Sequence, residues 1–234
     1  MRGQAIVTGG TKGIGRAIAT RLAADGFLVV AVARHPPAAK LPEGVTFAAC
    51  DVADPVAVKK MFSGFDRVDV LVNAAGQAGV NALVPEDPLW TEIIAVNLHG
   101  SWYCCTAALE KMPDGTGRIV NIASVLGLRG VPDQPAYCAA KHGLIGLTRS
   151  LALAVAGRGI TVNAVCPGWV DTDMARARFS ALGTDSAQVA TSVPLGRIAT
   201  PEDVAAAVAF LISPAACHIT GHALPVDGGA SVLA

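Results

Sequence analysis

Short apolar runs alternate with amphipathic stretches along almost the whole chain. Runs of strand length occupy residues 4–8, 28–33, 45–49, 68–73, 118–123, 160–166 and 223–226. Most of them are continuously apolar, which is typical of parallel strands covered on both faces. Segments with helical periodicity lie between them, at residues 13–25, 54–62, 88–112, 135–156 and 201–212. This alternation predicts an α/β fold, a doubly wound parallel sheet of seven strands with helices on both faces.

Two segments interrupt the alternation. Residues 34–44 contain three prolines, so we expect a short loop rather than a helix before the third strand. Residues 168–197 form a long insertion after the carboxyl end of a strand, which we expect to be irregular and to act as a substrate lid. The chain shows no internal repeat and no linker, so residues 1–234 are expected to form a single domain.

Composition narrows the class of protein. Of the 234 residues, 52% are hydrophobic and 15% are charged, and the formal net charge is zero. These values suit one α/β core and argue against a nucleic-acid surface or a polybasic membrane contact. No apolar stretch approaches the roughly 20 residues of a membrane span, and the first residues do not resemble a signal peptide. We therefore expect a cytoplasmic protein that does not bind membranes.

The cysteines and histidines show no metal-binding pattern. The six cysteines are scattered without a C-x-x-C motif, and the five histidines lack ligand spacing. Buried thiols in a reducing compartment are the favoured interpretation, and we expect no metal site.

Candidate chemistry is concentrated around Tyr137, one of only two tyrosines. Lys141 follows it by four residues, so on a helix both side chains lie on one face, one turn apart. A nearby ammonium stabilises phenolate, so we expect Lys141 to lower the pKa of Tyr137 from about 10 toward neutrality. Ser124 ends an apolar run thirteen residues earlier. A hydroxyl, an activated phenol and a lysine can together polarise a carbonyl group and protonate its oxygen.

A glycine-rich turn connects the first strand to the first helix. It comprises residues 8–15, and its expected cofactor-binding members are Gly9, Thr11, Lys12, Gly13, Ile14 and Gly15. Such a turn lets the backbone approach a pyrophosphate that lies at the helix N-terminus. A purely structural turn is the alternative, but the position between strand and helix favours nucleotide binding.

The end of the second strand bears on the choice of cofactor. A NAD site usually has a carboxylate there for the ribose 2′-hydroxyl, and this chain has Arg34 instead. Because Arg34 and Lys12 can bind a 2′-phosphate, we favour NADP(H), with NAD(H) possible if both are ordinary surface cations. Further residues at the ends of the third and fourth strands are placed to meet the adenine or the rest of the cofactor: Asp51, Val52, Asn73, Ala74 and Gly76.

Taken together, these motifs resemble those of the short-chain dehydrogenase/reductase family over essentially the whole chain. The resemblance is to its compact members, such as 3-oxoacyl-[acyl-carrier-protein] reductases and NADPH carbonyl reductases, and it implies a Rossmann fold. The matching features are the glycine turn, residues 73–76, Asn97, Ser124, the Tyr137/Lys141 pair, Pro167-Gly168 with Thr172, and residues 226–229. The chain departs from the family in its short 34–44 segment, where relatives usually carry a longer helix.

The resemblance also implies a role for each catalytic residue. Ser124 would bind the substrate oxygen, and Tyr137 would be the acid in reduction and the base in oxidation. Lys141 would lower the pKa of Tyr137 and hold the nicotinamide ribose, and Asn97 would fix a water that extends the proton relay. Cofactor contacts are implied for a segment after the sixth strand: Pro167, Gly168, Val170 and Thr172.

The residues expected to frame the substrate are mostly apolar and carry no charge. Besides Ser124 they are Leu126, Gln134, Trp169 and Met174. They favour a lipophilic or aromatic ketone (or the matching secondary alcohol), or a thioester-linked 3-oxoacyl chain, over a sugar or a small acid. Core packing of the same residues is the alternative.

Three other functions remain open. A 3-oxoacyl-[acyl-carrier-protein] reductase of fatty-acid or polyketide synthesis would dock an acidic carrier through basic residues, for which Arg129 and Arg158 are candidates. An NAD-linked secondary-alcohol dehydrogenase would run the reaction in the oxidative direction. A catalytically idle nucleotide-binding regulator would tolerate loss of the proton relay, which this chain retains.

The last expectation concerns assembly. The apolar helices around Trp102 and residues 144–153 carry more hydrophobic surface than one sheet face needs. The family resemblance implies that they pair between subunits of a homotetramer, and burial within one subunit is the alternative.

Overall fold

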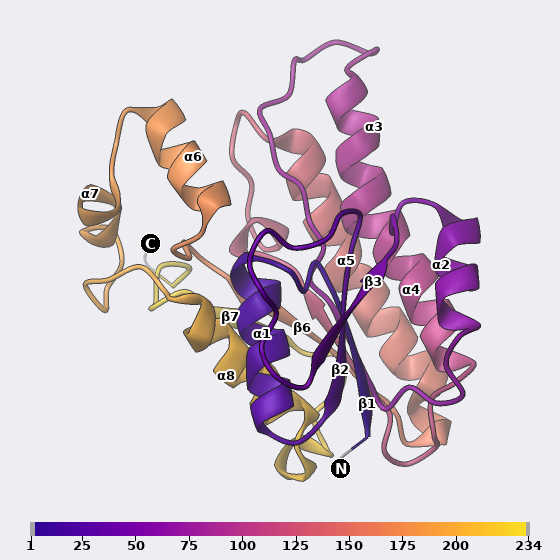
Figure 1. Cartoon of the computed structure of the whole chain (residues 1–234). Helices are drawn as coiled ribbons and strands as arrows, with labels where there is room; N and C mark the ends of the chain where they lie inside the picture. The colour runs from indigo at the N-terminus through magenta and orange to yellow at the C-terminus, as the bar shows by residue number, and fades with distance from the viewer. Residues whose placement is uncertain (1–2, 233–234) are drawn as a thin grey trace.

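A parallel sheet forms the centre of the computed structural model, which describes residues 3–232. Its strands are β1 (Gln4–Thr8), β2 (Leu28–Ala33), β3 (Val45–Ala49), β4 (Val70–Asn73), β5 (Arg118–Ile122), β6 (Thr161–Pro167) and β7 (Ala223–Val226). They lie in the order β3-β2-β1-β4-β5-β6-β7, and every neighbouring pair is parallel. The predicted doubly wound sheet is confirmed (Figure 1).

Helices cover both faces of the sheet (Figure 1). They are α1 (Gly13–Ala24), α2 (Pro55–Phe62), α3 (Pro88–Ile94), α4 (Gly100–Leu109), α5 (Pro135–Val155), α6 (Asp173–Leu182), α7 (Ser186–Ala190) and α8 (Pro201–Ile212). On one face Leu22 of α1 and Val208 of α8 pack in a core cluster with the strands. On the other face Phe62, Cys105 and Val155 place α2, α4 and α5 in a second cluster. Within the described residues, no helix is long and apolar enough to span a bilayer.

The strand order reverses between β1 and β4. Chain connections leave β1 toward β2 on one side and leave β4 toward β5 on the other. In open α/β sheets a crevice forms at such a switch point, outside the carboxyl ends of the strands. The glycine turn follows the carboxyl end of β1, residues 74–76 follow that of β4, and Ser124 follows that of β5. The topology therefore brings the candidate motifs to one side of the molecule.

The helix expected at residues 88–112 is interrupted. Between α3 and α4 the chain forms a π-helical segment, Ala95–His99, with Asn97 at its centre. The Asn97 amide Nδ2 donates to the carbonyl of Ile93 at 2.9 Å and to that of Gln77 at 2.7 Å. A π-helical bulge of this kind often marks a functional site. Hydropathy does not distinguish it from a regular helix, so the sequence predicted one element.

The segment between β2 and β3 is a loop, as its prolines predicted. It is braced by Arg16 of α1, whose Nη2 donates to the carbonyl of Lys40 at 2.7 Å. The loop therefore has a fixed support on the first helix, although it contains no helix of its own.

The prediction that residues 168–197 are irregular was wrong. This segment contains α6 and α7, and it is called the lid below after its predicted role, which stays a prediction. Thr172 Oγ1 accepts the Ala175 N–H at 3.3 Å and Asp185 Oδ1 accepts the Gln188 N–H at 2.8 Å, so each helix has a side-chain cap. Thr172 and Asp185 are residue types that cap helices, but the polar residues that follow them obscured the helical periodicity, so the sequence did not predict α6 and α7.

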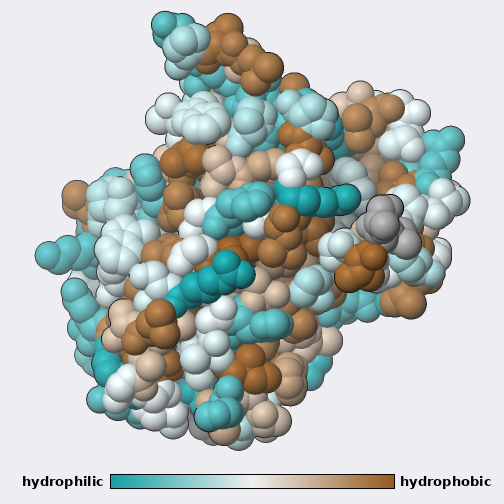
Figure 2. All heavy atoms as spheres, turned by 180° about the vertical axis from the view of Figure 1, so that it is seen from behind, coloured by the Kyte–Doolittle hydropathy of each residue, from teal (hydrophilic) through white to brown (hydrophobic). Residues whose placement is uncertain are grey.

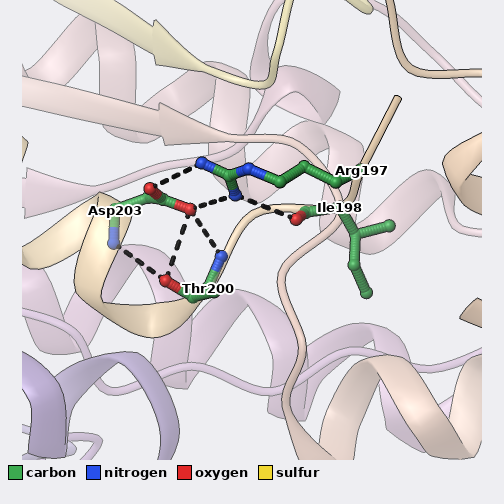
Figure 3. A network of polar contacts seen from close by, with 4 residues as sticks. All are labelled: Arg197, Ile198, Thr200 and Asp203. Atoms are coloured by element: carbon green, nitrogen blue, oxygen red, sulfur yellow. Dashed lines mark hydrogen bonds and ion pairs between the residues drawn. The ribbon is translucent and has the colours of Figure 1, made fainter. Parts of the chain in front are cut away.

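The two ends of the lid are held together at a stem. Val170 and Ala199 form a parallel bridge, in which Ala199 N donates to the Trp169 carbonyl at 2.9 Å. Next to it Arg197 binds both carboxylate oxygens of Asp203, at 2.6 and 2.9 Å, and Asp203 also accepts the Thr200 N–H (Figure 3). Thr200 and Asp203 form the capping box of α8. The lid is thus anchored on a rigid helix terminus, and α6 and α7 project from it (Figure 1).

Candidate active site

The three residues predicted to do the chemistry lie together after β5. Ser124 is buried, and its Oγ accepts the Leu126 N–H at 3.1 Å, so it caps the short 3₁₀ turn Val125–Gly127. Tyr137 and Lys141 occupy the first two turns of α5, and Lys141 Nζ lies 5.4 Å from the centroid of the Tyr137 ring. Lys141 is buried and donates to the carbonyl of Ile122, the last residue of β5, at 2.7 Å. This bond fixes the ammonium between sheet and helix.

The expected direction of the Tyr137 pKa shift was wrong for this structure. Burial raises the pKa of Tyr137 to about 12, and a side-chain hydrogen bond with Ser124 offsets only part of that rise. Burial also lowers the pKa of Lys141 to about 8. The ammonium lies over the face of the phenol ring and bonds a backbone carbonyl, so desolvation outweighs its attraction for a phenolate. Tyr137 is therefore a phenol at neutral pH, the form that donates a proton.

Asn97 joins this group from the π-helical segment. A Cβ placed on Gly76, just after β4, would lie 3.0 Å from Asn97 Oδ1 and 3.9 Å from Lys141 Nζ. Gly76, Asn97 and Lys141 therefore meet at the carboxyl end of β4. The Asn97 side chain is fully engaged, since its amide donates to two carbonyls and its Oδ1 accepts the Gln77 N–H at 3.4 Å. The water that Asn97 was expected to fix stays a prediction.

The glycine turn has the geometry of a phosphate cradle. A Cβ on Gly9 would lie 2.8 Å from the Ala74 carbonyl oxygen, and one on Gly15 would lie 2.2 Å from the Gly9 carbonyl oxygen, so neither position accepts a side chain. Gly13, with φ of +51°, opens α1. Lys12 at the N-cap makes no side-chain capping bond, and the first turn has no acidic residue. The N–H groups of that turn therefore remain available to an anion.

A cavity of about 570 Å³ adjoins this turn. Its basic lining residues are Lys12 and Arg16 from the start of α1 and Arg34 from the end of β2. Thr11, Gly13, His35 and the lid residue Asp173 also line it. Guanidinium and ammonium groups beside an open helix N-terminus suit a phosphorylated ribose. The donor set fits the adenosine end of a dinucleotide.

Not every residue predicted to touch the cofactor presents its side chain to this crevice. Asn73 is buried, and its Nδ2 donates to Asn121 Oδ1 at 2.8 Å inside the protein. Val52 is buried in the core beneath α4, where a Cβ on Gly100 would lie 2.8 Å from its Cγ2. Asp51 Oδ1 accepts the Ala53 N–H at 3.0 Å. Ala74 belongs to the backbone that packs on Gly9. The side chains of Asn73 and Val52 therefore have structural roles.

The segment after β6 reaches the glycine turn. A Cβ on Gly13 would lie 3.5 Å from Thr172 Cγ2, so the start of the lid borders the phosphate cradle. Pro167 ends β6, and a Cβ on Gly168 would lie 2.8 Å from Asp227 Cβ. Val170 is buried in the stem of the lid. The segment after β6 therefore joins the end of that strand, and the backbone beside the glycine turn, to the lid.

The predicted substrate residues come from three segments around the catalytic group. Leu126 lies in the turn after Ser124 and is half-buried, and Gln134 is buried immediately before α5. Met174 is exposed at the start of α6. Trp169 packs on Phe179 within the lid, with ring centroids 5.0 Å apart. Their role in framing a substrate stays a prediction.

Arg158 was wrong as a candidate contact near the site. Arg158 precedes β6 and therefore lies at the amino ends of the strands, whereas Ser124 lies at their carboxyl ends. Its Nη2 donates to the Met112 carbonyl at 2.8 Å and its Nε donates to Asp114 at 2.7 Å. Arg158 therefore braces the turn before β5. Arg129 remains exposed just after the 3₁₀ turn that Ser124 caps.

The structure also adds residues that sequence reasoning missed. Arg16 and Asp173 line the cavity beside the glycine turn, and His35 follows Arg34 there. Arg16 could have been found, because it follows Lys12 by one helical turn. Asp173 could not, since only the folded lid brings it to the cavity. Among the described residues, no cluster of potential metal ligands occurs, and all six cysteines are free thiols.

Comparison with known proteins assigns this arrangement to a family. A family model described as enoyl-(acyl carrier protein) reductase matches residues 9–231. The chain belongs to the short-chain dehydrogenase/reductase family. Its relatives include the Escherichia coli 3-oxoacyl-[acyl-carrier-protein] reductase, 42% identical over 96% of each chain. A 3beta-hydroxysteroid dehydrogenase of Mediterraneibacter gnavus is 36% identical over 96% of this chain and 93% of its own. The chain is thus an oxidoreductase of this family, which acts on a carbonyl group or an alcohol.

Solved structures of this family superpose closely on the chain. The ligand-free aldohexose dehydrogenase of Thermoplasma acidophilum has a TM-score of 0.91 at 37% identity, covering 99% of this chain and 94% of that one. A variant of the actinorhodin polyketide ketoreductase with NADPH has a TM-score of 0.86 at 37% identity, covering 98% and 97%. These short-chain dehydrogenase/reductase structures share the Rossmann-like sheet and its covering helices.

Proposed function

We propose that the protein is an NADP(H)-dependent carbonyl reductase that converts a lipophilic or aromatic ketone to its secondary alcohol. One observation carries the proposal. Ser124, Tyr137 and Lys141 meet at the same sheet edge as a cavity lined by Lys12 and Arg34. A proton donor and a phosphate-binding cavity at one edge are the two components that this reaction requires.

The chemistry divides between the cofactor and the chain. A bound nicotinamide supplies the hydride. The Ser124 hydroxyl holds the carbonyl oxygen of the substrate, and the Tyr137 hydroxyl donates the proton that this oxygen needs. Because the pKa of Tyr137 is about 12 and that of Lys141 about 8, both groups carry their protons at neutral pH. In this protonation state the phenol can donate the proton that reduction requires.

The choice of NADP(H) rests on charge. The cavity presents three basic side chains and one carboxylate, Asp173. A 2′-phosphate there meets Arg34 and Lys12, whereas NAD(H) has a hydroxyl in place of that phosphate. The actinorhodin ketoreductase with NADPH supports the same cofactor by similarity.

The substrate assignment rests on the apolar framing residues. Leu126, Trp169 and Met174 offer hydrophobic surface, and Gln134 is the polar exception. The steroid-acting relative is consistent with a lipophilic ketone. The alternative is a 3-oxoacyl chain on an acyl-carrier protein, which the E. coli relative favours and for which exposed Arg129 is a candidate contact.

Exposed apolar side chains and free thiols bear on the proposed oligomeric state and location of the protein. Trp90, Trp102 and Leu153 are large exposed apolar side chains, at 44, 45 and 82% exposure. The face seen in Figure 2 carries several groups of apolar residues among hydrophilic ones. We infer a homotetramer in which helix faces of this kind pair. The free thiols agree with a reducing, cytoplasmic location.

A substrate panel tests the proposed function. Oxidation of NADPH and of NADH is followed with steroid ketones, aromatic ketones, 3-oxoacyl thioesters and an aldohexose. We expect the highest kcat/KM with NADPH and a lipophilic ketone. A preference for the carrier-linked thioester would move the assignment to the alternative function. Rates no higher than the buffer control with every compound would refute a reductase.

A further inference from the structure

Three segments that are distant in sequence meet beside the catalytic helix. They are the loop after β4, the turn that leads into α5, and the lid helix α6. Asn81 is buried at their centre. Its backbone N–H donates to the Asp133 carbonyl at 3.0 Å, and its Nδ2 donates to Asp87 Oδ2 at 2.7 Å. Asp87 is itself the N-cap of α3, where its Oδ1 accepts the Leu89 N–H.

Asn81 also completes the N-terminus of α5. The N-cap residue of that helix, Gln134, makes no capping hydrogen bond, and Pro135 has no N–H to donate. The first free N–H, on Ala136, donates to Asn81 Oδ1 at 3.1 Å. Tyr137 is the next residue, so a side chain from another segment caps the turn that carries the proton donor.

The lid reaches the same place through an ion pair. Arg178 of α6 binds Asp133 through Nη2. The two side chains are only 19% and 35% exposed, so solvent screens this pair less than an exposed one. Phe179 is buried next to Arg178 and packs on Trp169 near the stem. The lid is therefore attached twice: its stem is anchored at Asp203, and the Arg178–Asp133 pair holds the middle of α6 to the turn before α5.

We propose that Arg178 and Asp133 are positioning residues, through which closure of the lid over a substrate sets the first turn of α5 and so the Tyr137 hydroxyl. Asn81 transmits the position, because it binds the Asp133 backbone and caps Ala136. The inference rests on the proposed carbonyl reductase function. It assigns to the lid an effect on the chemical step in addition to covering the substrate.

Arg176 provides a matched control for Arg178. It lies on the same helix, but its ion pairs with Asp171 and Asp173 are made within the lid itself. We expect Arg178→Met to lower kcat about fivefold and to raise KM, which corresponds to about 1 kcal/mol at 1.36 kcal/mol per factor of ten. Arg176→Met leaves kcat within about twofold of the wild type. The reversed pair, Asp133→Arg with Arg178→Asp, restores most of kcat, and Arg178→Lys restores part of it.

The outcomes separate positioning from general stability. Equal kcat values in Arg178→Met and Arg176→Met, or a loss that the reversed pair does not relieve, would overturn the proposal. A change in KM alone would show that the pair only retains substrate, and it would also overturn the effect on Tyr137.

A second measurement does not depend on turnover. Amide hydrogen exchange in the first turn of α5 should be faster in Arg178→Met than in Arg176→Met, while exchange in α1 and α8 stays unchanged in both. Identical exchange at Ala136 and Tyr137 in the two variants would contradict the coupling. If the wild-type protein reduces no carbonyl compound, the proposed function fails. The exchange experiment then still tests whether the Arg178–Asp133 pair positions the first turn of α5.

Discussion

Lys141 combines a functional position with an unfavourable environment. Its ammonium is buried, bonds one backbone carbonyl and has its pKa lowered to about 8. In the unfolded chain the same group titrates near 10.5. Between these values the unfolded state binds a proton that the folded state releases, so the free energy of unfolding increases with pH across this window. Below about pH 8 the folded protein bears the full cost of the buried charge.

Replacement of Lys141 tests that cost. We expect Lys141→Met to be more stable than the wild type at pH 7, by about 1 to 2 kcal/mol after the lost hydrogen bond is deducted. In urea unfolding, the wild type gains stability from pH 7.5 to 9.5 and the variant does not. Tyr137 acts in the opposite sense at higher pH, since its pKa rises from 10 to about 12 and stability falls across that interval. A less stable Lys141→Met, or parallel pH profiles, would contradict the desolvation argument.

In the proposed function, Arg34 is one of the residues that select the cofactor. It lines the cavity at the end of β2, where a carboxylate would favour NAD(H). We expect Arg34→Asp to raise KM for NADPH about 10- to 100-fold and to leave KM for NADH unchanged or lower. Lys59→Asp, at an exposed position on α2, is the control for net charge. Unchanged KM ratios in Arg34→Asp would show that Arg34 does not select the cofactor.

At the scale of elements, the capping box of α8 supports both a helix and the lid. Thr200 Oγ1 accepts the Asp203 N–H at 3.3 Å, and Asp203 binds Arg197 at the end of the lid. We expect Thr200→Ala to lower stability by about 1 kcal/mol and Tm by about 2 to 4 °C. The control is Thr191→Ala, whose exposed hydroxyl bonds one carbonyl within α7's last turn. Equal melting temperatures for the two variants would contradict the claim that the capping box of α8 stabilises the protein.

The elements differ in how far the sequence predicts them. Strands such as β1 and β2 are covered on both faces, so burial requires apolar runs that hydropathy detects. The first turn of α5 was placed correctly from Pro135 and the Tyr137/Lys141 spacing. The π-helical segment at Asn97 depends on a hydrogen bond to Gln77, a residue twenty positions away, and no local pattern encodes it.

The candidate active site shows the same division between what the sequence predicts and what only the fold reveals. Residue types and order predicted Ser124, Tyr137 and Lys141, because their chemistry constrains them locally. The direction of the Tyr137 pKa shift was missed, since it depends on how deeply the folded chain buries the phenol. The Asp133–Arg178 pair, 45 residues apart, also appears only in three dimensions.

At the scale of the whole molecule, the proposed tetramer rests on exposed apolar side chains. Trp102 on α4 and Leu153 on α5 remain exposed in the single chain. Light scattering after size exclusion should give about 95 kDa, four times the 23.7 kDa of one chain. Leu153→Glu should reduce that mass, and Leu83→Glu, an exposed loop position, should not. A monomer in the wild type would contradict the proposed tetramer.

The reaction itself depends on one hydroxyl. Tyr137→Phe removes the proton donor and keeps the ring that packs beside Lys141. With NADPH and the best ketone of the panel, we predict that this variant binds the cofactor as the wild type does and loses kcat by about 10²- to 10⁴-fold, the usual contribution of a positioned acid. A Tyr137→Phe protein with wild-type kcat would contradict the assignment of this site as a carbonyl reductase.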